Sequence, residues 1–308
     1  MKCPHCHNDE VPAEAAFCPF CGQKIEKPAK SQRPVQKLIV TTVVPASLKP
    51  DNWLFDKINL SVGENEIDLV RYPALLKGFK ARNPQNIVGI DMQYFEPRPF
   101  FYAHELFEGY NRLASVNLEG LRGVQLRSIY GMFAGCHSLE SVDLSPLDTS
   151  DITRFNDCDF NGMFAECHSL RHLDLSTFDT SRGEKFISMF NNCSSLEDID
   201  LSSWNTERAR SFLAMFANCS SLRSLDLSSF RTPKCREAKA MFANCTNLEH
   251  INMSGIDFSN CIYGNGLENM FKGCTSLKSV CLLGCNERTI NLVTLSLQFH
   301  CPSAQIIK

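Results

Sequence analysis

The stretch MFANCSSLRSLDLSSFRT, residues 215–232, recurs along the chain in closely similar form. MFNNCSSLEDIDLSSWNT stands just before it at 189–206, and MFAECHSLRHLDLSTFDT lies further upstream at 163–180. The starting methionines of the regular copies are 31, 26, 26, 26 and 29 residues apart. These starting residues are Met132, Met163, Met189, Met215, Met241 and Met270. A period of this length is typical of a solenoid, in which each repeat forms one coil stacked on the next.

The apolar residues of each copy fall in fixed columns when its methionine is counted as position 0. Cysteine stands at position 4, leucine at position 7, and further aliphatic residues at positions 10 and 12. Positions 10 and 12 alternate in the way that residues on one face of a strand do. We expect a larger apolar side chain at position 15 to fill the interior of each coil. That column contains Phe95, Leu121, Leu147, Phe178, Trp204, Phe230 and Ile256.

These columns predict an α/β repeat solenoid of the leucine-rich-repeat type. Each coil would add one short strand to a parallel sheet on one face, and each M-F-x-x-C half turn would form a short helix on the other. Less regular copies begin at Leu106 and, one period earlier, around Ile87, Ile90 and Met92; a truncated copy closes the chain at 297–308. We expect the cysteines to be free and buried, because helices pack about 10 Å apart and a disulfide needs Cα atoms within about 7 Å.

The first 22 residues carry two C-x-x-C pairs, Cys3 with Cys6 and Cys18 with Cys21. Two such turns can direct four thiolates at one tetrahedral ion, so the pattern predicts a structural zinc site held by these four cysteines. A segment this small cannot fold on apolar burial, and metal binding would supply its folding free energy. The alternatives are a pair of disulfides, a redox C-x-x-C and an iron site.

The chain therefore divides into four parts. Residues 1–22 are the zinc ribbon, 23–50 a flexible basic linker, and 51–105 an N-terminal cap with the first eroded repeat. Residues 106–308 are the leucine-rich-repeat solenoid with its truncated C-terminal repeat. A cap is expected because an uncovered terminal coil exposes both its core and its sheet edge.

The repeat pattern MF-x-x-C-x-x-L-x-x-L-D-L-S-x-F-x-T-S resembles that of the BspA-like leucine-rich-repeat surface proteins of bacteria, over about residues 80–308. The resemblance implies an extended, non-catalytic solenoid used for adhesion or protein binding. The first 22 residues resemble the short zinc ribbon found at the N-termini of many bacterial proteins. A ribbon stands where a signal peptide would be expected in an exported member of that family.

Two outward columns of the predicted sheet are candidates for a binding face. Position 9 varies freely between copies, as expected where a repeat protein encodes its partner, and it includes His172, Asp198, Ser224 and His250. We expect the two histidines to be solvated polar residues. Position 11 carries a run of acidic residues that includes Asp174, Asp200 and Asp226. Stacked carboxylates repel; we expect the hydroxyls of the serines two residues further on to donate hydrogen bonds to them, with a cation site as the alternative.

The composition and the motifs argue against an enzyme. The sequence contains no nucleophile elbow, no phosphate-binding loop and no zinc-protease motif. The cysteines recur at the same position of each repeat, as expected of core residues and not of a single catalytic nucleophile. The net charge is −3, and residues 1–50 hold seven Lys/Arg and four Asp/Glu, so the remainder is acidic. An acidic body disfavours nucleic acid as the main partner.

The function predicted from the sequence is therefore a non-catalytic protein–protein interaction scaffold, with the zinc ribbon as an accessory module. We expect a protein partner, no small-molecule substrate and no membrane span. The first residues lack a signal peptide, which predicts a cytoplasmic protein with reduced thiols. The alternatives are a cell-surface adhesin of the BspA-like type and docking of the solenoid on nucleic acid through the ribbon.

The ribbon assignment predicts one tightly bound structural zinc per chain. Replacing Cys18 and Cys21 together by serine should abolish that binding, because two ligands cannot hold the ion. Elemental analysis of the purified full-length chain and of the double variant measures the ratio of zinc to protein. Zinc that stays bound to the double variant at the wild-type ratio would contradict the assignment.

Overall fold

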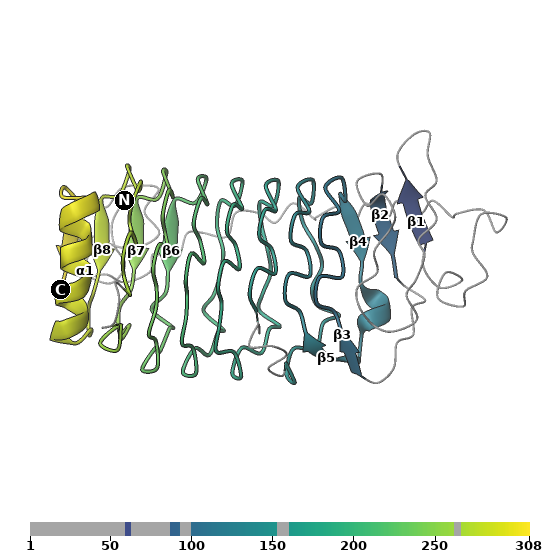
Figure 1. Ribbon diagram of the computed structural model, residues 1–308, viewed down its shortest axis with the longest axis horizontal. Helices are drawn as coiled ribbons and strands as arrows, with labels where there is room; N and C mark the ends of the chain where they lie inside the picture. The colour runs from purple at the N-terminus through teal and green to yellow at the C-terminus, as the bar shows by residue number, and fades with distance from the viewer. Residues whose placement is uncertain (1–58, 63–86, 93–99, 153–159, 262–265) are drawn as a thin grey trace, which may run out of the picture.

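The computed structural model describes residues 59–62, 87–92, 100–152, 160–261 and 266–308. In this part of the chain the backbone winds as a row of stacked coils, from β1 (Asn59–Val62) at one end to α1 (Glu287–His300) at the other (Figure 1). The side chains at positions 0, 1, 4 and 7 of the regular copies are buried and form one continuous core along the row. The repeat solenoid predicted from the sequence is confirmed.

Parallel strands at positions 9 to 11 fix the register of the coils. β6 (Ser224–Asp226), β7 (His250–Asn252), β8 (Ser279–Cys281) and β9 (Gln305–Ile307) form one sheet in chain order. Near the other end β2 (Ile87–Asp91) pairs in parallel with β4 (Ser115–Asn117), with Ile90 opposite Val116. The spacing of 26 residues between these two confirms that an eroded copy precedes the one beginning at Leu106. A separate parallel pair joins β3 (Phe100–Tyr102) to β5 (Gln125–Ser128).

The expectation that every coil contributes a strand is wrong for the middle of the solenoid. Residues 141–143, 172–174 and 198–200 occupy the strand positions, yet none of them is assigned to a strand. These are the coils whose position 11 is Asp143, Asp174 or Asp200. Like charges on adjacent strands oppose close pairing, whereas β6 and β7 place Asp226 opposite the neutral Asn252.

The predicted short helices are also absent: in the described residues the M-F-x-x-C segments form turns. Backbone amides alternate between two uses, so that the N–H of Phe216 donates to Met241 in the next coil and the N–H of Cys219 closes a turn onto Phe216. An α-helix would need every amide within its own coil. Ala214 and Asn218 also have positive φ, 51° and 64°, and the left-handed conformation interrupts a right-handed helix.

The cysteines at position 4 join neighbouring coils. The thiol of Cys219 donates to the carbonyl of Phe190 in the preceding coil at 3.1 Å, and Cys245 donates to Phe216 at 3.0 Å. The same contact is made by Cys136, Cys167, Cys193 and Cys274. All the cysteines of the described residues are free, as the sequence analysis expected.

Aromatic side chains stack along the axis in register with the coils. At position 1 the rings of Phe107, Phe133, Phe164, Phe190, Phe216, Phe242 and Phe271 follow one another at centroid distances of 5.2 to 6.1 Å. A second, shorter column contains Phe160, Phe186 and Phe212. The described members of the position-15 column are buried as predicted, and Trp204 stacks on Phe230; Phe95 lies outside the described residues. Stacked aromatic pairs contribute beyond their buried area.

The threonine at position 17 bridges coils with a single hydroxyl. Thr206 donates to the carbonyl of Arg231 at 3.0 Å and accepts from the N–H of the same residue at 2.9 Å. Thr149, Thr180 and Thr232 do the same to their following coils. These threonines are buried, and each hydroxyl satisfies one donor and one acceptor of the following coil in a partly buried environment.

Both ends of the solenoid are covered. At the N-terminal end β1 runs antiparallel to β2 and pairs with its outer edge, within the predicted cap. At the C-terminal end α1 buries Thr289, Val293 and Leu297, and its N-terminus is capped by Asn286, whose side chain accepts from the N–H of Thr289. The sequence analysis did not predict this helix. No helix in the described residues has the length and apolarity that crossing a bilayer requires.

The threonine bridge predicts a matched pair of effects on stability. Thr206→Val keeps the shape of the side chain but leaves the partly buried N–H and carbonyl of Arg231 without this partner, which should lower the stability by about 1–3 kcal/mol in total. Thr206→Ser keeps the hydroxyl and should be the milder change. Chemical denaturation of both variants measures the difference, and equal stability of the two would contradict the bridging role.

Candidate binding face

The outward side chains of positions 9 and 11 lie beside buried position-10 residues, as the strand pattern predicts. Leu173 is buried between the exposed His172 and Asp174. In the next coil, Asp198 and Asp200 are likewise exposed on either side of the partly buried Ile199. The structure therefore brings four of the predicted face residues together over two adjacent coils.

His172 and Asp198 form a cross-coil pair at position 9. The Nδ1 atom of His172 lies 2.7 Å from Oδ1 of Asp198, and the two side chains are 63% and 77% exposed. At position 8 the guanidinium of Arg171 lies 3.5 Å from the carboxylate of Glu197. Exposed pairs of this kind contribute only about 0.2–1 kcal/mol each. They help to set the register, and both signs of charge remain accessible to a partner.

The acidic column at position 11 is stabilised by the serines two residues further on, through their backbone N–H groups in addition to the predicted hydroxyl hydrogen bond, which is seen at Ser176. Asp174, Asp200 and Asp226 each accept a hydrogen bond at 2.9 Å from the backbone N–H of the serine two residues on. The hydroxyl and backbone hydrogen bonds of Ser176 hold the pKa of Asp174 below its ordinary value, against the charge of Asp200 in the next coil. Asp174 therefore stays ionised at neutral pH, and the aspartates at position 11 form an acidic stripe on the central coils.

The side chains at position 9 become progressively more buried toward the C-terminal end. Ser224 and Asp226 are partly buried, and His250, which pairs in register with Ser224, is 7% exposed. The prediction of a solvated His250 is therefore wrong. Its Nδ1 lies 2.8 Å from the hydroxyl of Ser279, and burial lowers its pKa, with Glu249 opposing and Lys278 reinforcing the shift. The sequence could not show this, because position 9 passes from exposed to buried toward the C-terminal end while its residue types stay polar.

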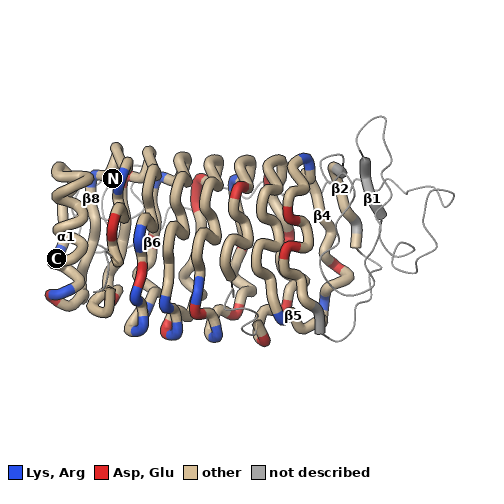
Figure 2. The backbone as a smooth tube through the Cα atoms, in the orientation of Figure 1, with Lys and Arg blue, Asp and Glu red and all other residues tan. Residues whose placement is uncertain are grey.

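Charges over the whole solenoid are interspersed, with both signs present along the coils and at the turns (Figure 2). At position 8 the ammonium of Lys278 lies 2.6 Å from the carboxylate of Glu249. The copy that begins at Met132 is longer than most because of extra residues within 151–162. Only the ends of this segment are described, and there Asp151 contacts both Arg127 and Arg182. The acidic stripe at position 11 is thus a local feature of the central coils.

Further cysteines lie near the two ends of the chain, within residues 1–22 and 281–301. The proposed zinc ligands Cys3, Cys6, Cys18 and Cys21 lie outside the described residues. The C-terminal cysteines do not form one cluster. Cys281 contacts the hydroxyl of Ser254, Cys285 donates to the carbonyl of Met253, and Cys301 donates to backbone carbonyls of the coil before it.

The sequence analysis missed a cluster on the turns. His137, Glu166 and His168 come from adjacent coils and place one ligand atom each within 4.8 Å of the others. The signal was present in the sequence, since these residues depart from the repeat at positions 3 and 5. Beside His168 runs an open polar groove of about 610 Å³, whose other lining residues are Asn192, Ser194, Asn218, Ser220 and Asn244.

The buried His250 predicts a loss of stability in acid. Its folded pKa lies below its ordinary value of 6.5, so as the pH falls through that value the unfolded chain binds more protons and gains relative stability. His250→Gln removes this contribution, and its melting temperature should fall less than that of the wild type between about pH 7.5 and pH 5. Parallel acid-dependent decreases in the two proteins would contradict the buried neutral state.

Comparison with known proteins places the repeats in a family. A model described as "Mycoplasma protein of unknown function, DUF285" matches residues 103–216 and 127–258, which together span half of the chain. No curated protein matches the sequence.

The solved structures that resemble this chain include a leucine-rich cell surface protein of Faecalibacterium prausnitzii A2-165. The identity is 14% and the TM-score is 0.32, and the alignment covers 68% of this chain and 55% of that one. A leucine-rich repeat protein from Bacteroides ovatus ATCC 8483 has 14% identity and a TM-score of 0.30, covering 80% and 76% of the two chains. The aligned part of this chain thus spans little more than half the length of the first of these proteins. The family match rests on the repeats that build the coils, and the chain belongs to the DUF285 family.

Proposed function

We propose that the solenoid is a non-catalytic scaffold that binds a protein partner through the outward side chains at positions 8 to 11 of its central coils. We call this surface the strand face, because β6, β7 and β8 occupy positions 9 to 11 in the later coils. The observation that carries this proposal is the contrast between fixed and variable positions. The residues that recur in every copy are buried in the ladders and stacks described above, whereas His172 and Asp198 are exposed on the same framework. A rigid surface whose variable positions face the solvent is suited to recognition.

The charges on this face suit a basic protein surface. Asp174 and Asp200 are exposed in neighbouring coils, and the serine hydrogen bonds keep Asp174 ionised. Lysine and arginine side chains of a partner could pair with this stripe and relieve the repulsion between its members. Arg171 and His172 lie beside it and would set the orientation of the partner.

The zinc ribbon at residues 1–22 is proposed as a structural accessory module on a basic linker. The repeat resemblance to BspA-like surface proteins supports an adhesin role as the alternative, in which the same face would bind a protein outside the cell. In the nucleic-acid alternative the ribbon would dock while the solenoid holds a protein. In the scaffold, adhesin and nucleic-acid hypotheses alike, a protein binds to the strand face. The hypotheses differ in where in or outside the cell that partner is found.

A photo-crosslinking amino acid at a face position tests the proposal in intact cells of the source organism. Replacing Asp198 should give a discrete adduct with one protein, since this side chain is exposed at the centre of the face. The matched control replaces Glu207, which is exposed in the same coil but lies outside positions 8 to 11. Mass spectrometry identifies the captured protein.

The same adduct from both positions, or none from Asp198, would contradict binding at the strand face. Adding Asp174→Lys and Asp200→Lys to the Asp198 crosslinking variant should remove the adduct if the acidic stripe is part of the interface. An adduct with an extracellular protein favours the adhesin alternative, and an adduct with a cytoplasmic protein favours the scaffold inside the cell.

A further inference from the structure

Three departures from the repeat meet on one edge of the solenoid. At position 5 the copies after the second have Ser194, Ser220, Thr246 and Thr275, whereas the first two have His137 and His168. At position 3 the regular copies have Gly135, Asn192, Asn218, Asn244 and Gly273, and only the second has a charged residue, Glu166. Departures from an otherwise regular pattern are where function is expected.

The stacking of the coils does not explain the two histidines. In the following coils the hydroxyl at position 5 joins neighbours, as Ser194 does to the carbonyl of His168 and Ser220 to that of Ser194. A histidine at this position replaces the short hydroxyl side chain with an imidazole. The ring of His168 stacks on that of His137 at a centroid distance of 4.5 Å, with an angle of 23° between the planes.

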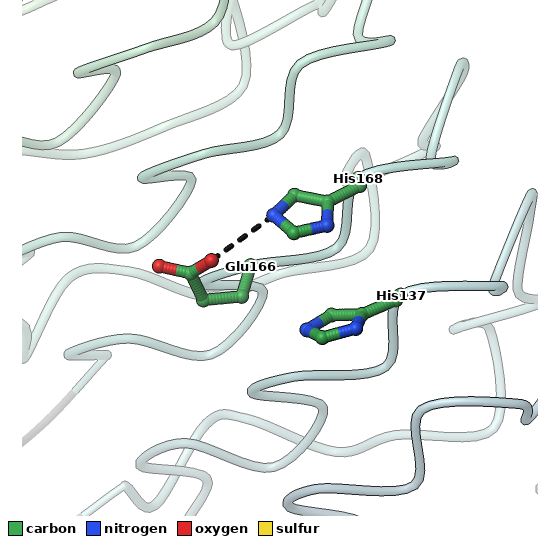
Figure 3. A group of neighbouring side chains, drawn as sticks. All are labelled: His137, Glu166 and His168. Carbon is green, nitrogen blue, oxygen red and sulfur yellow. Dashed lines mark hydrogen bonds and ion pairs between the residues drawn. The ribbon is translucent and has the colours of Figure 1, made fainter.

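The carboxylate of Glu166 is held beside these rings. One of its oxygens, Oε2, lies 3.0 Å from Nε2 of His168, and the other accepts a hydrogen bond from the side-chain amide of Asn192. Figure 3 shows the two rings over one another, each with a nitrogen on the side where the carboxylate lies. All three side chains are partly exposed, so an ion could reach them from solution.

The backbone at Glu166 supports a specific role for this side chain. Its φ is 63°, in the left-handed region that glycine and asparagine occupy at the same position in the other regular copies. A glutamate there carries a conformational cost that neither residue would have. An exposed ion pair with one histidine contributes too little to account for this choice.

We propose that His137, Glu166 and His168 bind a divalent transition-metal ion, with Zn²⁺ as the preferred ion. Two imidazoles and one carboxylate form a donor set typical of zinc and its neighbours, whereas Ca²⁺ and Mg²⁺ prefer oxygen ligands throughout. The ion takes the place of the proton between Glu166 and His168, and rotation of the partly exposed His137 side chain out of its stacked position brings its ring nitrogen into contact with the ion. Asn192 orients the carboxylate as an outer-shell partner.

The site spans two coils and leaves a coordination position for water or for a group from another molecule. Because His168 also lines the polar groove, that position opens toward a surface formed by the amides and hydroxyls of the next coils. This edge is separate from the strand face at positions 8 to 11. The metal site therefore does not depend on the proposed scaffold function.

Zinc titration of the full-length chain tests the site. The protein is first loaded with one equivalent of zinc for the predicted ribbon, and further Zn²⁺ is then followed by calorimetry and by the NMR signals of the histidine rings. Wild-type protein should bind a second ion and shift the ring signals of His137 and His168. His137→Ser, Glu166→Asn and His168→Ser should each weaken this second binding at least about tenfold.

These substitutions introduce residues that other copies carry at the same positions, so the coils should still stack, and thermal melts verify that they do. His172→Ser is the matched control, since it removes an exposed histidine next to a carboxylate on the strand face. Unchanged second binding in the three cluster variants, or no second binding at millimolar zinc, would overturn the site. Repeating the titration with Cys18→Ser and Cys21→Ser separates it from the ribbon, because the histidine site should persist in that background.

Discussion

The structure depends on hydrogen bonds between adjacent coils that keep one register along the row. A coil cannot satisfy all of its polar groups by itself: the amide of Phe216 needs the following coil, the thiol of Cys219 needs the preceding one, and the hydroxyl of Thr206 both donates to and accepts from its neighbour. A coil displaced by one residue would lose all three contacts and leave the groups buried without partners, which is costly. The nearly invariant length of the repeat follows from this constraint, and extra residues are accommodated only where a loop can leave the coil.

Much of the fold could be predicted from the sequence because its core columns recur in register. The buried leucines, the position-15 residues and the eroded copy at Ile90 were found in this way. The turns that replace the helices could not be, since M-F-x-x-C is compatible with either form and left-handed residues such as Ala214 carry no composition signal. The missing central strands fall in coils with an aspartate at position 11, and the sequence alone does not show which of these aspartates the stack brings next to one another. Helix α1 was missed because its apolar residues continue the aliphatic pattern of the repeat.

The candidate sites were predictable to different degrees for a related reason. Comparing the same position in successive copies identified the exposed face at His172 and Asp198. There the alternation of buried and exposed residues determines which side chains point to solvent. It failed at His250, since burial there depends on the surroundings and not on the repeat. The histidine cluster was visible as a break in the pattern, but its residues stand at two different positions of two copies. Their proximity follows only from the way the turns stack. The strand face and the turn edge thus offer two independent surfaces, one suited to a protein and one to an ion.

The buried thiols bear on the compartment in which the chain can work. Burial raises the pKa of Cys274 to about 12 and that of Cys219 well above its ordinary range, so these sulfurs stay protonated at neutral pH. Oxidation and disulfide exchange need the thiolate and access to it. The buried position-4 cysteines of the folded solenoid are therefore slow to react with oxidants, and this part of the chain does not depend on a reducing environment. A core of this kind can keep its thiols reduced in an oxidising compartment as well as in a reducing one.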